Sequence, residues 1–169
     1  MSCFRGAIQN RLRKEDFMKK QDSYDYYVGI DCAQNKHDFA MKNNQDKFLI
    51  KRGHFSNTLQ GYEKFLNTVL SKCLNKDKIL FGMEVTGIYG TNLYERLKSD
   101  GYHVVMISPD SVKNYRDYKR LSKTDKIDSG CIAELLLNGD AQIVHVAKNG
   151  YTDLKAYIRR RNALKVTCT

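Results

Sequence analysis

The amino-acid sequence predicts an α/β domain in which helices cover the faces of a mixed, five-stranded sheet. Short apolar runs rich in β-branched and aromatic residues occur at 26–31, 78–84 and 103–107, as is typical of strands. Two further short segments, joined by a polar turn within residues 37–52, indicate a hairpin. A segment with apolar residues at helical spacing precedes each of the strands predicted at 78–84 and 103–107. A hairpin meander followed twice by helix and strand gives a mixed sheet with flanking helices.

Length and charge restrict the functional class. The chain has 169 residues, enough for one domain with its own core. Lysine and arginine number 29 against 19 acidic residues, and the formal net charge of +10 favours a polyanionic partner, nucleic acid before a membrane surface. Charge alone also fits a merely soluble basic protein.

Cysteine usage and hydropathy indicate the compartment. The five cysteines are scattered and include no C-x-x-C pair, which argues against a disulfide framework and a zinc knuckle and favours a reducing cytoplasm. No apolar run reaches the roughly 18 residues that a membrane span needs. The N-terminus also lacks the apolar region of a signal peptide. We therefore expect a cytoplasmic protein without a membrane anchor.

The first elements place an acid on a buried strand. Residues 1–25 are basic and show little apolar periodicity, so we expect a basic tail that is disordered or loosely helical. The run 26–31 then reads as a strand that ends in Asp31. A carboxylate on a buried strand is costly unless it is paired or binds a metal, so Asp31 is a candidate functional residue. Segments 37–42 and 47–52 follow as the hairpin.

The second acid also ends a strand. Apolar residues up to Cys73 follow helical spacing, and Ser56 or Asn57 offers an N-cap for that helix. The next strand, 78–84, ends in Glu84. The glycines that follow this strand allow close approach of backbone or substrate.

The middle of the chain carries interleaved basic and aromatic side chains. A helix at 92–98 and a strand at 103–107 lead into residues 110–124, where lysines and arginines alternate with tyrosine and leucine. This pattern suits a nucleic-acid backbone with bases nearby, and it suits equally well a solvated helix whose tyrosines pack on the core.

Asp125 and Asp128 stand three residues apart at the start of an apolar helix that ends near residue 138. On a helix the two side chains share one face and can converge on one point. Two like charges at about 4 Å repel by roughly 4 kcal/mol at an effective dielectric of 20, so an inward pair favours a bound cation. Acids are also favoured in a first turn by the helix dipole, with Ser122 or Thr124 as the cap. On this stretch alone, the capped helix is the stronger interpretation.

The four acids together favour a metal. Asp31 and Glu84 end strands, while Asp125 and Asp128 begin a helix, and Mg²⁺ prefers oxygen ligands from separate elements around a substrate phosphate. The sequence thus suggests a Mg²⁺ site for phosphoryl transfer on nucleic acid.

Four motifs carry a resemblance to a known family. They are Val28-Gly29-Ile30-Asp31 with Lys36-His37-Asp38, Gly82-Met83-Glu84-Val85-Thr86-Gly87-Ile88-Tyr89, Lys123-Thr124-Asp125-Lys126-Ile127-Asp128, and Leu154 with Arg159-Arg160-Arg161. Over roughly residues 26–166 the chain resembles the N-terminal half of the DEDD transposases of insertion-sequence family one-ten, relatives of Piv-type DNA invertases.

The resemblance implies a RuvC-like, ribonuclease-H-type fold and Mg²⁺ bound by Asp31, Glu84, Asp125 and Asp128, which would be the catalytic residues. It further implies DNA and a structured guide RNA as partners, a homo-oligomer, a coiled coil and a C-terminal domain with a catalytic serine. The candidate nucleic-acid-binding residues are Lys113, Arg116, Lys119, Arg120, Lys123, Lys126, Arg159, Arg160 and Arg161.

These implications divide the chain into a basic tail (1–25), a RuvC-like domain (26–147) and the start of a coiled-coil helix (148–169). Because the chain stops there, the sequence suggests a truncated transposase that binds metal and nucleic acid but does not recombine DNA alone. Two alternatives stay open: a stand-alone RuvC-like nuclease or junction resolvase, and a non-catalytic nucleic-acid-binding remnant. An actin-like ATPase is disfavoured because no second glycine-rich phosphate loop is present.

Overall fold

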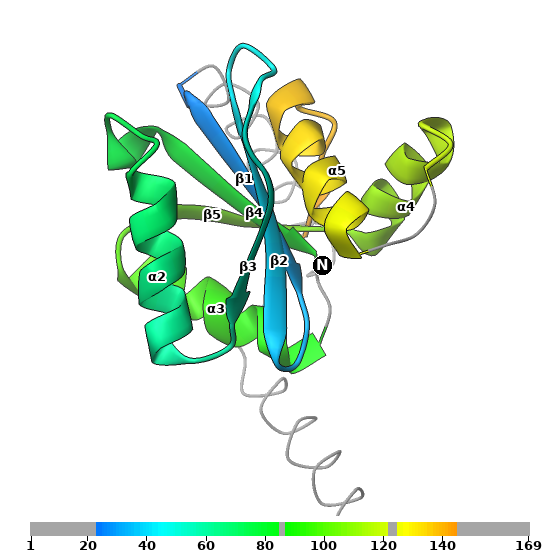
Figure 1. Ribbon diagram of the computed structural model, residues 1–169. Coiled ribbons are helices and arrows are strands. Elements are labelled where there is room, and N and C mark those ends of the chain that lie inside the picture. The colour runs from blue at the N-terminus through cyan, green and yellow to red at the C-terminus, as the bar shows by residue number, and fades with distance from the viewer. Residues whose placement is uncertain (1–22, 85–86, 122–124, 145–169) are drawn as a thin grey trace, which may run out of the picture.

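The computed structural model describes residues 23–84, 87–121 and 125–144. Its six strands form one sheet in the order β3-β2-β1-β4-β5-β6, flanked by helices (Figure 1). The strands are β1 (Tyr26–Cys32), β2 (Lys36–Asn43), β3 (Phe48–Ser56), β4 (Ile79–Glu84), β5 (His103–Ile107) and β6 (Ile143–Val144). The helices are α2 (Leu59–Leu70), α3 (Gly87–Ser99), α4 (Pro109–Tyr118) and α5 (Asp125–Asn138), with the short 3-10 helix η1 (Lys76–Lys78). The predicted α/β class with a mixed sheet is confirmed.

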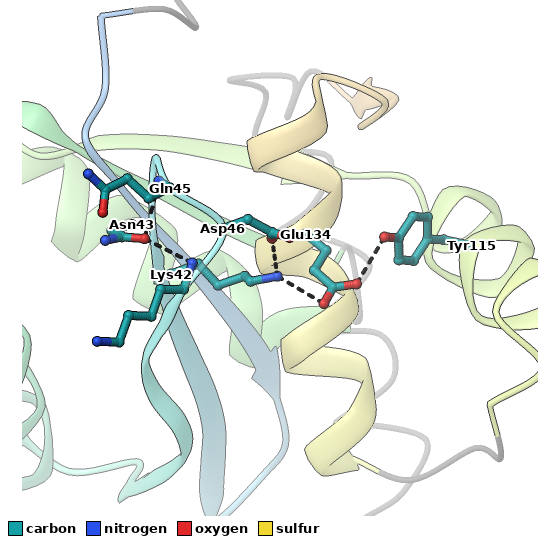
Figure 2. Close-up of polar contacts among 7 residues, drawn as sticks. Lys42, Asn43, Gln45, Asp46, Tyr115 and Glu134 are labelled. Carbon is teal, nitrogen blue, oxygen red and sulfur yellow. Dashed lines mark hydrogen bonds and ion pairs between the residues drawn. The ribbon is translucent and has the colours of Figure 1, made fainter.

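The first three strands form an antiparallel meander. In β1 and β2, Ile30 lies opposite Phe39, and β2 pairs in turn with β3. The turn between β2 and β3 is closed by Asn43, whose Oδ1 accepts hydrogen bonds from the backbone N–H groups of Gln45 at 3.2 Å and Lys47 at 2.9 Å (Figure 2). An asparagine that bonds the backbone ahead of it is typical of such a turn, and the polar turn predicted here is present.

The centre of the sheet is parallel. The chain leaves β3, forms α2 on one face and returns as β4, which pairs in parallel with β1 so that Ile30 lies opposite Met83. Strand β5 then pairs in parallel with β4. The sixth strand, β6, pairs antiparallel with β5. The sequence indicated only a short extended piece at β6, because a two-residue strand has no periodicity of its own.

Two apolar clusters lie on the two faces of the sheet. On the first face, which we call the α2 face, Phe65 of α2 and Leu97 of α3 pack on Val28 and Ile30 of β1. On the second, the α5 face, the helices α4 and α5 pack on the sheet through a separate cluster that includes Tyr27 and Leu80. Figure 1 shows the two pairs of helices on opposite sides. Alternate residues of β1, β4 and β5 therefore belong to opposite cores.

Two helix boundaries differ from the predictions. The N-cap of α2 is Thr58, whose side chain accepts from the N–H of Gly61 at 3.1 Å, so the prediction of Ser56 or Asn57 was wrong by one or two residues. Ser56 instead ends β3. Helix α3 begins at Gly87, five residues before the predicted helix at 92–98. Gly87 and Gly90, which lie before the predicted helix, form part of α3.

Across the described residues, no helix is both long enough and apolar enough to cross a membrane. The predicted basic tail, apart from its last three residues, and the predicted coiled-coil helix lie outside the described residues.

Candidate metal centre

Strand pairing makes Asp31 and Glu84 neighbours. Ile30 of β1 lies opposite Met83 of β4 in a parallel register, and each acid is the next residue of its strand. Both strands alternate between the two cores, so Asp31 shares the α5 face with Tyr27, and Glu84 shares it with Leu80. The two carboxylates therefore lie at the same end of adjacent strands and on the same face.

The pKa of the Cys32 thiol reflects the negative charge of these two carboxylates. Burial, and then the charges of Asp31 and Glu84, raise the pKa of Cys32 to about 12. Both carboxylates are therefore close enough to oppose formation of a thiolate at the end of β1. This end of the sheet is an acidic environment into which a cation would fit.

A third acid, Asp38, extends the same row and was missed as a candidate. It lies directly opposite Asp31 in the antiparallel pair of β1 and β2, so both side chains are on one face of the sheet. Asp38 is 5% exposed, and its Oδ2 lies 3.3 Å from the Nζ of Lys36. We call Asp38, Asp31 and Glu84 the carboxylate row. The sequence signal for Asp38 was its position as an acid in the predicted strand segment His37 to Met41, most of which is apolar.

Helix α5 crosses directly over Gly29 of β1. A Cβ atom at Gly29 would lie 2.2 Å from the carbonyl oxygen of Ser129 and 2.5 Å from the amide nitrogen of Ala133. Further along the helix, Glu134 bonds Lys42, which lies opposite Tyr27. Helix α5 therefore runs antiparallel to β1, and its first turn lies toward the end of β1 that carries Asp31.

Asp128 lies in this first turn and is ion-paired. Its Oδ1 accepts a hydrogen bond from Nη1 of Arg116 on α4 at 2.7 Å. The side chains are 8% and 12% exposed, so the pair is largely shielded from water. The hydrogen bond to Asp128 also raises the pKa of Arg116. A guanidinium thus provides the positive charge next to Asp128.

Asp125 is the first residue of α5, one turn before Asp128. Its side chain lies outside the described residues, as do Lys123 and the side chain of Lys126. Within the ranges that the structure describes, no three His, Cys, Asp or Glu side chains come together closely enough to hold a metal ion. The structure thus brings Asp31 next to Glu84 and orients α5 toward them, but it does not show a closed four-carboxylate site.

The donor chemistry nevertheless fits Mg²⁺. Asp31 and Glu84 are carboxylates, the ligand type that Mg²⁺ prefers. Mg²⁺ commonly binds through one or two carboxylates and keeps water molecules at its other positions. The acidic end of β1 and β4 supplies two such groups. Oδ1 of Asp128 is already bonded to Arg116, so a metal would share this carboxylate with the guanidinium or replace it.

The predicted nucleic-acid-binding residues fall into different environments. Lys113, Lys119 and Arg120 on and after α4 are exposed to solvent, and the side chain of Tyr118 is 81% exposed. Arg116 differs from them, because its side chain is mostly buried against Asp128. Arg159, Arg160 and Arg161 lie outside the described residues.

A buried polar network fastens α5 to the sheet and to α4 (Figure 2). Lys42 is 3% exposed, and its Nζ bonds Asp46 and, at 3.0 Å, Oε1 of Glu134. The hydroxyl of Tyr115 donates to Oε2 of Glu134 at 2.9 Å. Burial and the bond to Glu134 raise the pKa of Tyr115. The network joins β2, α5 and α4, and no sequence pattern predicted it.

A mixed sheet with acids at the ends of its central parallel strands, and a helix with acids in its first turn packed over them, defines an α/β domain of the ribonuclease-H-like type. Comparison with known protein families matches residues 28–169 to the transposase family of insertion-sequence IS110 elements, the DEDD transposases. The chain belongs to this family, as its motifs suggested. A comparison with curated proteins found no match.

Proposed function

We propose that this chain binds Mg²⁺ through Asp31, Glu84, Asp125 and Asp128 and positions nucleic acid for the phosphoryl-transfer steps of DNA transposition. Membership of the transposase family implies DNA transposition as the general process. The observation that supports the metal site best is the pairing of β1 with β4, which makes Asp31 and Glu84 neighbours on one face. The partners in this proposal are DNA, a structured guide RNA and further copies of the chain.

The side chains have distinct tasks in this proposal. Asp31 and Glu84 are held by the central strands of the sheet and form the rigid half of the site. Asp125 and Asp128 belong to the first turn of α5, which is fastened through Glu134 and so approaches the strands at a fixed position. When bound, Mg²⁺ would stabilise charge on the reacting phosphate and favour a deprotonated attacking oxygen. The exposed cations near α4 attract the nucleic-acid backbone.

Isosteric neutral variants test the site. Asp31→Asn, Glu84→Gln and Asp125→Asn each remove one charge and preserve shape, so we expect each to weaken Mg²⁺ binding by about tenfold or more, which is about 1.4 kcal/mol. Isothermal titration calorimetry of the full chain measures this loss.

Asp77→Asn is the matched control, because Asp77 is an exposed acid in η1 on a different part of the chain. We expect its Mg²⁺ affinity to equal that of the unmodified chain. If Asp31→Asn and Glu84→Gln also bind Mg²⁺ normally, these residues are not ligands and the proposal fails.

A further inference from the structure

A cavity of about 360 Å³ opens on the α2 face of the sheet, near the end that carries the carboxylate row. It lies among β2, β3, α2 and α3, and its lining includes His37, Phe55, Asn57, Leu59, Tyr62 and Arg96. His37 of β2 pairs with Cys32, the residue after Asp31, and belongs to the opposite face from Asp38. The cavity and the carboxylate row are therefore at one end of the sheet, on its two opposite sides.

Nε2 of His37 is buried and has no hydrogen-bond partner among the described side chains and backbone groups. The residue is 1% exposed, and its Nδ1 accepts a hydrogen bond from the backbone N–H of Ala33 at 3.3 Å. In the neutral ring the proton therefore resides on Nε2. Within the part of the chain that the structure describes, Nε2 has no hydrogen-bond partner. A buried donor left in this way costs about 1 to 3 kcal/mol, which a ligand with an acceptor atom would recover.

The environment keeps this ring neutral. Burial lowers the pKa of His37, so the imidazole remains uncharged at neutral pH. A polar contact with the Asn57 carboxamide acts in the opposite direction and raises the pKa, although Nε2 has no hydrogen bond among the described residues. The Nδ2 of Asn57 donates instead to the carbonyl oxygen of Gln34 at 3.0 Å. His37 therefore offers a single neutral N–H group.

Arg96 supplies a cation at the same cavity. Its guanidinium lies 5.3 Å from the ring centroid of Tyr62, and its Nε is 3.4 Å from Oδ2 of Asp100. The Tyr62 hydroxyl also donates to Asp100 at 2.7 Å, so both side chains are anchored by the same carboxylate. The Arg96 side chain remains 53% exposed. Its outer N–H groups can therefore reach a phosphate, while its inner edge is held in place.

We propose that this cavity binds one unpaired nucleotide of the bound nucleic acid, with the base accepting a hydrogen bond from His37 Nε2–H and the phosphate contacting Arg96. Small-ligand sites begin at about 300 Å³, so the volume suits a single nucleotide. The lining also suits a nucleotide, because its aromatic and aliphatic side chains would contact the flat base and Arg96 would contact the phosphate. This inference rests on the proposed function, since it assumes that nucleic acid reaches this end of the sheet.

Nuclear magnetic resonance of the histidine side chains tests the proposal on the full chain. The Nε2–H signal of His37, assigned by its loss in His37→Gln, is followed during titration with thymidine 5′-monophosphate, thymidine and inorganic phosphate. We expect the nucleotide to shift this signal strongly, thymidine to shift it more weakly and phosphate to leave it unchanged. DNA and RNA both contain such a unit, so short oligothymidylate and oligouridylate show which source binds more tightly.

Two variants provide the matched comparison. Arg96→Gln removes the proposed phosphate contact, and we expect it to weaken nucleotide binding by about tenfold. Arg52→Gln removes the same charge from an exposed position on β3, outside this cavity, and we expect less than about a twofold change because it removes only long-range attraction.

Three outcomes overturn the proposal. An equal shift with inorganic phosphate would mark a simple anion site, and equal losses in Arg96→Gln and Arg52→Gln would mark non-specific attraction. A third outcome is that the His37 signal does not shift although oligothymidylate binds and Mg²⁺ affinity depends on Asp31. This result would refute the nucleotide site but leave the proposed function intact. Conversely, normal Mg²⁺ binding by Asp31→Asn refutes the proposed function without affecting the His37 titration.

Discussion

Arg116 and Asp128 form an ion pair in a largely water-excluded position, and Asp128 is one of the predicted metal ligands. Desolvating two charges is expensive, and their attraction repays that cost only while both partners are present. Removing Arg116 leaves the carboxylate buried without a cation. Adding a divalent cation could fill the same electrostatic role. Stability and metal binding are thereby coupled at this one position.

We expect Arg116→Gln to lower the free energy of unfolding by about 3 kcal/mol in the absence of divalent metal, because an uncompensated buried charge remains. Mg²⁺ should restore part of this loss, since it binds the folded state and supplies the missing positive charge. Urea denaturation with and without Mg²⁺ measures both effects.

Lys113→Gln is the control for this prediction, because Lys113 is an exposed cation on the same helix. It should leave stability nearly unchanged under both conditions. An Arg116→Gln variant that Mg²⁺ stabilises no more than the control would show that the metal does not replace the guanidinium.

Helix α5 is placed by close backbone contact rather than by side-chain interdigitation alone. The Gly29 position meets main-chain atoms of Ser129 and Ala133, whereas a Cβ at Gly82 would meet mainly the flexible end of Leu136, at 2.7 Å. Main-chain atoms of a helix cannot move individually. A side chain at Gly29 must therefore displace the whole element that carries Asp125 and Asp128.

We expect Gly29→Ala to destabilise the domain by about 3 kcal/mol, at the upper end of the usual cost of overpacking. It should also weaken Mg²⁺ binding, because the first turn of α5 moves away from Asp31. Gly82→Ala is the matched variant, and a cost of about 1 kcal/mol is expected because Leu136 can change rotamer. Urea unfolding and calorimetry together measure these effects, and equal costs for the two variants would contradict this account of α5.

The elements themselves were largely predictable from sequence, because strands and amphipathic helices have local periodicity. Asp31 and Glu84 could be selected as acids that end apolar runs. Asp38 could likewise have been noticed as an acid within a predicted strand, but its place beside Asp31 depends on the register between β1 and β2. The bond between Lys42 and Glu134 joins residues 92 positions apart, and no local pattern encodes such a partner. These contacts between residues distant in the sequence were therefore visible only in the structure, because hydrophobic periodicity describes local segments.

The charge of the whole molecule sets how the chain meets nucleic acid. The formal net charge is +10, and the exposed cations that follow the start of α4 lie on the same helical layer as α5. Each phosphate neutralised by a cation releases counterions, so binding weakens as salt concentration rises. Cations in contact with phosphate should therefore be distinguishable from those that only add to the overall field.

We expect Lys113→Gln and Lys119→Gln each to reduce the slope of log affinity for DNA against log salt concentration by about 1. Lys64→Gln, an exposed position on α2 across the sheet, should leave the slope unchanged. Fluorescence anisotropy at several salt concentrations measures the slopes. An identical decrease for all three variants would indicate that the α4 cations make no direct phosphate contact.

The parallel pairing of β1 with β4 also determines the order in which this domain can assemble. The β1 to β3 meander pairs segments that are neighbours in the chain, whereas the pairing of Ile30 with Met83 closes a much longer loop. Until β4 inserts, the edge of β1 that will bind it stays open and Asp31 has no neighbour in Glu84. A nascent chain therefore cannot bring Asp31 and Glu84 together before its central strand β4 has been synthesised.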